Sequence, residues 1–236
     1  MDRLLKSLLC LLLVTLTWTQ FAHGAVAVQT LGSSPGASVG PYAVTAFTLN
    51  AQSFPGDGAH VFLVVGGPGG TTLPLNPFGT KYTAGVTWLS WGNGYTGPVY
   101  FYQGGQVATI GAPALTRALY FYAQPTQSGS LSFTIQTDAG GSYTYSLPSL
   151  TRTGGASGVG FYTTAGEAIT SVMVSSTDPT GFAFGQFGLF AGSALQPTAI
   201  PALNQIPALN HVALALLGLL MVAAVFMARR HELIRK

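Results

Sequence analysis

Short runs rich in valine, threonine, tyrosine and phenylalanine recur along the middle of the chain, separated by glycine, proline, serine and asparagine. No segment of residues 25–198 has convincing helical periodicity, and such runs between turn-forming residues are typical of an all-β sandwich or barrel. The sequence therefore predicts an all-β fold. The expected strands cover residues 42–50, 60–65, 82–90, 99–103, 106–110, 115–123, 130–137, 142–147, 158–163, 169–176 and 182–190.

Within residues 130–137, apolar and polar side chains alternate, which places Leu131, Phe133 and Ile135 on a core face and their neighbours toward water. The segment 138–141, Asp-Ala-Gly-Gly, is a natural hairpin turn after this strand. Two other strands share a phrase, "VYFYQ" at 99–103 and "LYFYAQ" at 119–124. In each, a period of two puts both tyrosines on one face and the phenylalanine on the other.

Charge and cysteine content exclude several classes of protein. Residues 25–198 hold three basic and four acidic side chains, a net charge of 3 − 4 = −1. The basic residues are scattered, whereas nucleic-acid binding requires clustered Lys and Arg, so no nucleic-acid partner is expected. The single cysteine, Cys10, lies in the N-terminal segment, so the rest of the chain has no disulfide or Cys-ligated metal.

Several short motifs resemble catalytic or ligand-binding motifs, but the residues and elements around them do not match those that such sites require. Residues 36–40 match G-x-S-x-G, but no helix is expected after them, and a flexible N-terminal loop explains them better. His60 opens an apolar strand without partner ligands, and the glycine-rich residues 64–72 lack the lysine and helix of a phosphate-binding loop. The four acidic residues, Asp57, Asp138, Glu167 and Asp178, are far apart in sequence and sit in expected turns. We expect no catalytic residues, no metal site and no cofactor.

One aromatic segment suggests a binding site. In "TWLSWGNGYTG", residues 87–97, Trp88 and Trp91 bracket the end of an expected strand, and Tyr95 follows an Asn-Gly turn. Trp91 and Tyr95 could stack on sugar faces, because such rings combine an apolar body with a polar edge. The alternative is that Trp88 belongs to the core and the other two cap the sandwich.

The two ends of the chain have the features of an export signal and a membrane anchor. A basic start, a short apolar run and small residues predict a signal peptide over residues 1–24, with cleavage after Gly24 or, alternatively, Ala27. Residues 212–228 are apolar and uncharged, near the lower limit for a transmembrane helix. Arg229 and Arg230 begin the basic tail, 229–236, which the positive-inside rule leaves in the cytoplasm.

The segment before the apolar run repeats five letters, "IPALNQIPALN" at 200–210. This order of short motif, brief helix and arginine pair resembles the IPTL-CTERM sorting signals processed by exosortase-type enzymes of Gram-negative bacteria. Three of the four leading letters match in Ile206, Pro207, Ala208 and Leu209, whereas Asn210, His211, Val212 and Ala213 replace the usual Ser-Glu-Trp-Gly. The resemblance implies the membrane and an exosortase-type enzyme as partners, and a proline-containing motif stays extended where a protease can read it.

A second resemblance covers about residues 118–190, which look like the jelly-roll-like sandwiches that often precede such anchors. In many of those, the last strand carries paired carboxylates. Here Ala183, Phe184, Gly185 and Gln186 occupy that region, so the resemblance carries over neither an acidic site nor an activity.

Together these features predict an antiparallel, jelly-roll-like β-sandwich over residues 25–199 and a linker with the sorting motif over 200–211. The expected protein is a non-enzymatic cell-surface or extracellular-matrix protein, held at the inner membrane during sorting. The alternative is a carbohydrate-binding β-sandwich on a single-pass anchor, with extracellular polysaccharide as its partner.

Overall fold

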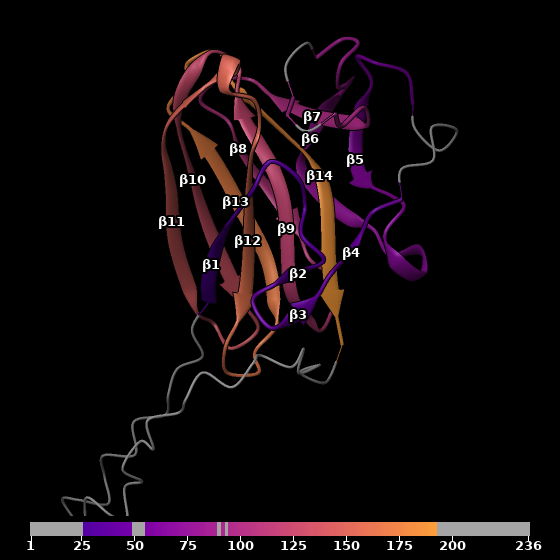
Figure 1. The fold of residues 1–236 in the computed structure, drawn as a ribbon, viewed down its shortest axis with the longest axis vertical. Coiled ribbons are helices and arrows are strands. Elements are labelled where there is room, and N and C mark those ends of the chain that lie inside the picture. Colours follow the sequence, from indigo (N-terminus) through magenta and orange to yellow (C-terminus); the bar gives the residue numbers. More distant parts are fainter. Residues whose placement is uncertain (1–25, 49–54, 89–90, 93, 193–236) are drawn as a thin grey trace, which may run out of the picture. The chain divides into compact units, whose positions relative to one another are not determined.

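The computed structural model describes residues 26–48, 55–88, 91–92 and 94–192, and these form an all-β structure (Figure 1). The strands are β1 (Val26–Leu31), β2 (Ser38–Val39), β3 (Tyr42–Ala43), β4 (Thr45–Ala46), β5 (His60–Val64), β6 (Leu73–Thr83), β7 (Pro98–Tyr102), β8 (Val107–Gly111), β9 (Thr116–Pro125), β10 (Ser128–Thr137), β11 (Ser142–Thr151), β12 (Ser157–Thr163), β13 (Ile169–Ser176) and β14 (Phe182–Ala191). Two single-turn 3₁₀ helices, η2 (Pro68–Gly70) and η3 (Arg152–Gly154), lie between strands. The predicted all-β class is confirmed.

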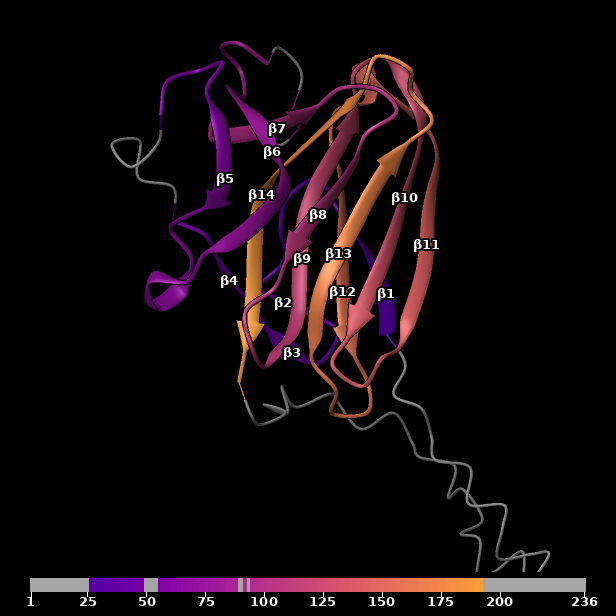
Figure 2. The same ribbon diagram turned by 180° about the vertical axis from the view of Figure 1, so that it is seen from behind.

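The strands pair in the order β1-β12-β9-β14-β7-β6-β8-β13-β10-β11, with β4 added on β14 and β5 on β6. All these pairings are antiparallel. Strand β6 belongs to both halves of the path, because Thr80 pairs with Phe101 of β7 and Leu75 pairs with Ile110 of β8. The path therefore folds over at β6, and Figures 1 and 2 show β12, β9 and β14 facing β8, β13, β10 and β11 as a sandwich.

The main core lies between these two layers and is rich in phenylalanine. Phe121 and Phe161 from one layer contact Phe133 from the other at ring-centroid distances of 5.7 and 5.6 Å, and all three are fully buried. The alternation predicted for β10 is confirmed, because Leu131, Phe133 and Ile135 have no exposed surface. On the outer face of β10, hydroxyl groups pair across strands instead, as between Ser132 and Ser146.

The two strands with the shared phrase point their tyrosines in opposite directions relative to this core. Tyr100 and Tyr102 of β7 belong to the main core, while Tyr120 and Tyr122 of β9 lie on the outer face of their layer. The tyrosines of each strand do share one face, as predicted. Consequently Phe101 of β7 faces outward, toward the tryptophans.

The first strands cover the outer face of β9 and β12. Val39 of β2 is fully buried there, and a methyl group added at Gly160 would lie 2.7 Å from it. The hydroxyl of Tyr42 donates a hydrogen bond of 3.1 Å to the Thr163 carbonyl. The expectation of a flexible loop at residues 36–40 is therefore wrong: the segment forms a packed β2–β3 hairpin.

Two expected strands also need correction. The chain leaves β6 at Thr83 and turns, so the expected strand over 82–90 does not continue through the described residues 84–88, and Trp88 contacts the sheet through a bridge to Ala84. The expected strand over 42–50 is divided into β3 and β4, because the pairing changes partner between them. Strands β1 and β2 and most of β6 were not predicted.

Four expected segments lie outside the described residues. They are the signal peptide 1–24, the linker 200–211 with Ile206, Pro207, Ala208 and Leu209, the helix 212–228, and the tail with Arg229 and Arg230. Among the residues that are described, no helix is long and apolar enough to cross a membrane.

The described chain begins and ends on the same side of the sandwich. Here the word edge means one of the two sides where the strands start and stop. Val26 of β1 pairs with Thr163 at the end of β12, and Ala191 of β14 pairs with Thr116 at the start of β9. The opposite edge carries the start of β14, where Phe182 pairs with Pro125. This far edge holds the candidate site.

Candidate functional site: an aromatic pocket at the far edge

A pocket of about 250 Å³ opens at this edge. Its wall comes from the end of β6 and the turn after it, from β7, from the β9–β10 turn and from η3. The lining residues are Tyr82, Thr87, Trp88, Phe101, Thr126 and Arg152. Segments far apart in sequence therefore build one concave surface.

Three half-buried aromatic rings form one side of the pocket. The Trp88 and Phe101 ring centroids are 5.8 Å apart, and Tyr82 lies 6.1 Å from each of them. The rings rest on small buried side chains of the underlying strands, Val99 and Ala183. The packed side chains beneath the rings therefore support this side of the pocket.

A buried glutamine joins the aromatic side to the basic side. Gln124 has no exposed surface; its Oε1 accepts a hydrogen bond of 2.9 Å from the Trp88 indole nitrogen. Its Nε2 donates a hydrogen bond of 2.5 Å to the Arg152 carbonyl. A single side chain on β9 thus fixes the indole ring and the start of η3 together.

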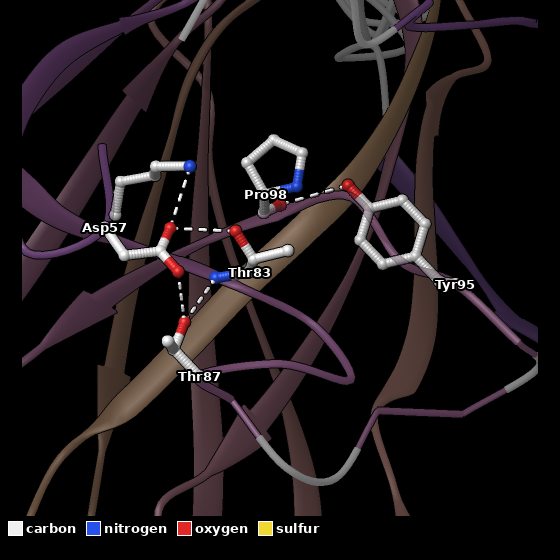
Figure 3. A network of polar contacts seen from close by, with 6 residues as sticks. Asp57, Thr83, Thr87, Tyr95 and Pro98 are labelled. Carbon is white, nitrogen blue, oxygen red and sulfur yellow. Dashed lines mark hydrogen bonds and ion pairs between the residues drawn. The ribbon is translucent and has the colours of Figure 1, made fainter. Parts of the chain in front are cut away.

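The turn that carries Thr87 and Trp88 is held by a carboxylate (Figure 3). Asp57 accepts hydrogen bonds from Lys81 Nζ at 2.8 Å and from the Thr83 and Thr87 hydroxyls at 2.8 and 2.5 Å. Partial burial alone would raise the pKa of Asp57, but the hydrogen bonds outweigh it and lower the pKa to about 2. Asp57 is therefore ionised at neutral pH, and its hydrogen bonds fix the turn that forms this wall of the pocket.

Trp91 and Tyr95, the residues expected to stack on a ligand, are half-buried beside this network. The Trp91 indole nitrogen donates a hydrogen bond of 3.3 Å to Gln186 Oε1, and the Tyr95 hydroxyl donates one of 3.0 Å to the Pro98 carbonyl (Figure 3). Burial raises the pKa of Tyr95 well above its usual range. Neither residue lines the pocket, so stacking by this pair stays a prediction, while Trp88 is the tryptophan in the pocket wall.

Two polar groups complete the pocket. The Thr126 hydroxyl is buried and has no hydrogen-bond partner within the described part of the chain. Arg152 is exposed, and its guanidinium makes no hydrogen bond or ion pair with another described residue. A wall of apolar rings with a few polar groups is the usual composition of a small-molecule site.

The other sequence motifs lie apart from this pocket. Ser38 of the G-x-S-x-G match is followed by β3 instead of a helix, and residues 64–72 form the turn with η2, as predicted. His60 opens edge strand β5, where it stacks on Phe78 at 4.0 Å. Among the described residues, no group of three or more His, Cys, Asp or Glu side chains could hold a metal ion.

The other carboxylates have structural contacts. Asp138 accepts a hydrogen bond from the Ala168 amide at 2.8 Å, and Asp178 accepts one from the Gln127 amide at 2.6 Å. Glu167 is buried, and its Oε1 has no partner in the described ranges. None of the three lines the pocket.

Four pocket residues, Tyr82, Phe101, Thr126 and Arg152, were not singled out from the sequence. One sequence feature indicated Phe101. A large ring on the face of β7 opposite two tyrosines must be covered by other side chains, and the tryptophans cover it. No sequence signal pointed to Arg152, because its place in the pocket depends on how β11 ends beside β9.

No protein-family model matches the chain, and no curated protein matches its sequence. A solved structure that shares 9% sequence identity is a carbohydrate-binding module in complex with β-1,4-galactotriose. The match covers 51% of this chain and 88% of that one, with a TM-score of 0.27.

Proposed function

We propose that this chain is a non-enzymatic exported surface protein whose β-sandwich binds carbohydrate in the pocket lined by Trp88. The observation that carries the proposal is the set of three aromatic rings around a pocket of about 250 Å³. Pockets for drug-sized ligands start at about 300 Å³. The volume therefore suits one sugar ring with its neighbours outside.

The composition supports a carbohydrate ligand over an apolar one. Sugar rings present C–H faces to aromatic side chains and hydroxyl groups to polar ones, and the pocket offers both kinds of surface. Phe101, Trp88 and Tyr82 supply the apolar wall, and Thr87 and Arg152 supply polar groups at its rim. This proposal places sugar stacking on Trp88 instead of Trp91 and Tyr95.

The delivery part of the proposal rests on the terminal sequences. A signal peptide over 1–24 and the IPTL-CTERM-like segment at 206–209 with the apolar run 212–228 favour export and sorting by an exosortase-type enzyme. The described sandwich ends at the edge opposite the pocket. The same proposal includes the resemblance of residues 118–190 to the jelly-roll-like sandwiches that precede such anchors.

A glycan-array screen of the detergent-solubilised full chain, followed by calorimetric titration of the retained glycan, tests the binding function. Trp88→Ala should weaken binding at least about tenfold, because a tryptophan at the centre of a site commonly dominates the affinity. Trp91→Phe is the matched control: it keeps an aromatic ring outside the pocket and should leave the affinity unchanged. Retention of no glycan, or loss of binding in Trp91→Phe with full binding in a folded Trp88→Ala, would contradict this assignment.

Intact-mass analysis of the protein from its native host tests the sorting function. Processing near Leu209 should remove the apolar helix and the basic tail together. Pro207→Ala, compared with Pro201→Ala in the first copy of the repeat, identifies which copy is read. Recovery of the chain ending at Lys236 from a strain that carries the processing enzyme would leave a single-pass anchor instead.

A further inference from the structure

Arg152 has a fixed backbone and an uncommitted side chain. Its amide donates a hydrogen bond of 2.7 Å to the Gln127 carbonyl, and its carbonyl accepts one from Gln124. Thr151, the residue before it, caps η3 through a hydrogen bond from the Gly154 amide. These contacts place the guanidinium at the pocket while leaving its N–H donors available.

The charges of the described residues leave Arg152 without compensation. Lys81 pairs with Asp57 at 2.8 Å, and Arg117 donates to the Gly166 carbonyl. Of the remaining carboxylates, Asp138 and Asp178 accept hydrogen bonds from backbone amides, and no ion pair joins any described carboxylate to Arg152. The pocket therefore carries a net positive charge beside its aromatic wall.

We propose that the pocket is selective for an acidic sugar, a uronic-acid residue of an anionic polysaccharide, over its neutral counterpart. This inference rests on the proposed carbohydrate-binding function and names its substrate class. The sugar ring lies against Trp88, and its carboxylate accepts charge-assisted hydrogen bonds from the Arg152 guanidinium. The planar fork of an arginine matches the two oxygens of a carboxylate, and such bonds are about twice as strong as neutral ones.

Thr126 adds a second contact on the same side of the pocket. Its buried hydroxyl has no partner in the described chain, which is unfavourable for a polar group. In this proposal the Thr126 hydroxyl donates to the ligand, since Thr126 lines the pocket. An acidic sugar then satisfies both the guanidinium and this hydroxyl, whereas a neutral sugar leaves the positive charge unpaired.

The test compares trisaccharides that differ only in the C6 group, trimannuronate with β-1,4-mannotriose and trigalacturonate with α-1,4-galactotriose, on the full chain in uncharged detergent. At low salt, at least one acidic member should bind about tenfold more tightly than its neutral partner. The preference should shrink as ionic strength rises, because an exposed charge pair is screened.

Arg152→Gln should abolish the preference while retaining neutral-sugar binding, since glutamine keeps hydrogen-bonding groups but no charge. Arg117→Gln, the same change at the arginine bonded to Gly166, is the matched control and should keep the preference. Acetate and inorganic phosphate form a further arm: competition by these simple anions as strong as by the uronates would mean a general anion site and overturn the proposal.

The outcomes separate this inference from the function beneath it. Equal affinity for acidic and neutral trisaccharides, with binding still lost in Trp88→Ala, overturns the acidic selectivity alone. A preference that survives in Arg152→Gln also overturns it. If none of the four trisaccharides binds and the glycan array retains no glycan, both the selectivity and the carbohydrate-binding function are overturned.

Discussion

The Trp88 indole nitrogen lies 2.9 Å from Oε1 of Gln124, a side chain with no exposed surface. The contact joins the turn after β6 to the end of β9, 36 residues further along the chain. Because the same glutamine also donates to the Arg152 carbonyl, both walls of the pocket depend on one buried amide.

Gln124→Leu should therefore destabilise the protein by about 1–3 kcal/mol, since it leaves the half-buried Trp88 indole N–H without its acceptor and removes one of the two hydrogen bonds to the Arg152 carbonyl, which also accepts from the Gly155 amide. Gln136→Leu is the matched control, because Gln136 bonds to Ser142 on the exposed face of the β10–β11 pair. That change should cost less than about 0.5 kcal/mol. Urea denaturation of both variants measures the difference, and equal costs would contradict a structural role for Gln124.

Asp57 makes the turn after β6 sensitive to acid. Its pKa is about 2 in the folded protein against 3.8 without these contacts, so its contribution to stability is fully present above about pH 4. The contribution is lost as the pH falls through about 2, when the carboxylate takes up a proton and releases Lys81, Thr83 and Thr87. Asp57→Asn should show weaker pH dependence of stability between pH 4 and 2 than the wild type.

Denaturant midpoints at several pH values, read from tryptophan fluorescence in a background with Trp18→Phe and Trp91→Phe, measure this effect near Trp88. The same slope in Asp57→Asn and in the parent would mean that other groups control the acid response.

Buried tyrosines make the protein sensitive to base. Burial, and secondarily the neighbouring Tyr122, raise the pKa of Tyr120 to about 12, and burial raises the pKa values of Tyr100 and Tyr102 as well. Stability from these groups is complete below pH 10 and is lost as the pH rises through their folded pKa values, because the unfolded chain ionises first. Phenolate absorbance should therefore rise in two phases, and a single transition near pH 10 in the folded protein would contradict this.

Gly160 tests the packing of the first strands on the sandwich. A Cβ at this position would lie 2.7 Å from Val39 Cγ1, so Gly160→Ala should destabilise the protein by about 1–3 kcal/mol. Val39→Ala in the same chain should recover part of the loss, and a double-mutant cycle measures the coupling. Gly32→Ala, where nothing lies within 4 Å, should be close to neutral. Additive costs for Gly160 and Val39 would contradict their contact.

The sequence allowed prediction of strands whose pattern depends on one buried face. In β10 the alternation of Leu131, Phe133 and Ile135 with polar residues is sufficient, since each apolar side chain meets the opposite layer. Strand β6 escaped prediction because Pro74, Pro77 and Gly79 interrupt it, and such residues usually end strands. It persists here because it changes partner from β8 to β7 partway along its length.

The sequence allowed prediction of the segment that carries the site, but not of the residues that line the pocket. The aromatic cluster at residues 87–97 marked the correct region, but the tryptophan that enters the pocket wall depends on distant partners. Gln186, at a positive φ of 57° in the β14 bulge, accepts the Trp91 indole hydrogen bond, while Gln124 accepts that of Trp88. Such pairings arise from the register of β14 on β9, which no local pattern contains.

Strand β14 also determines how the sandwich bears mechanical load. It runs from Phe182, near the pocket edge, to Ala191, at the edge where the described sandwich ends, and it lies between β9 and β7. A pull along this strand acts across hydrogen bonds perpendicular to it, so the bonds resist in shear together instead of opening one by one. A domain held at one end and drawn by a polymer at the other would therefore unfold at high force, and single-molecule pulling through the C-terminus should find its rupture at β14.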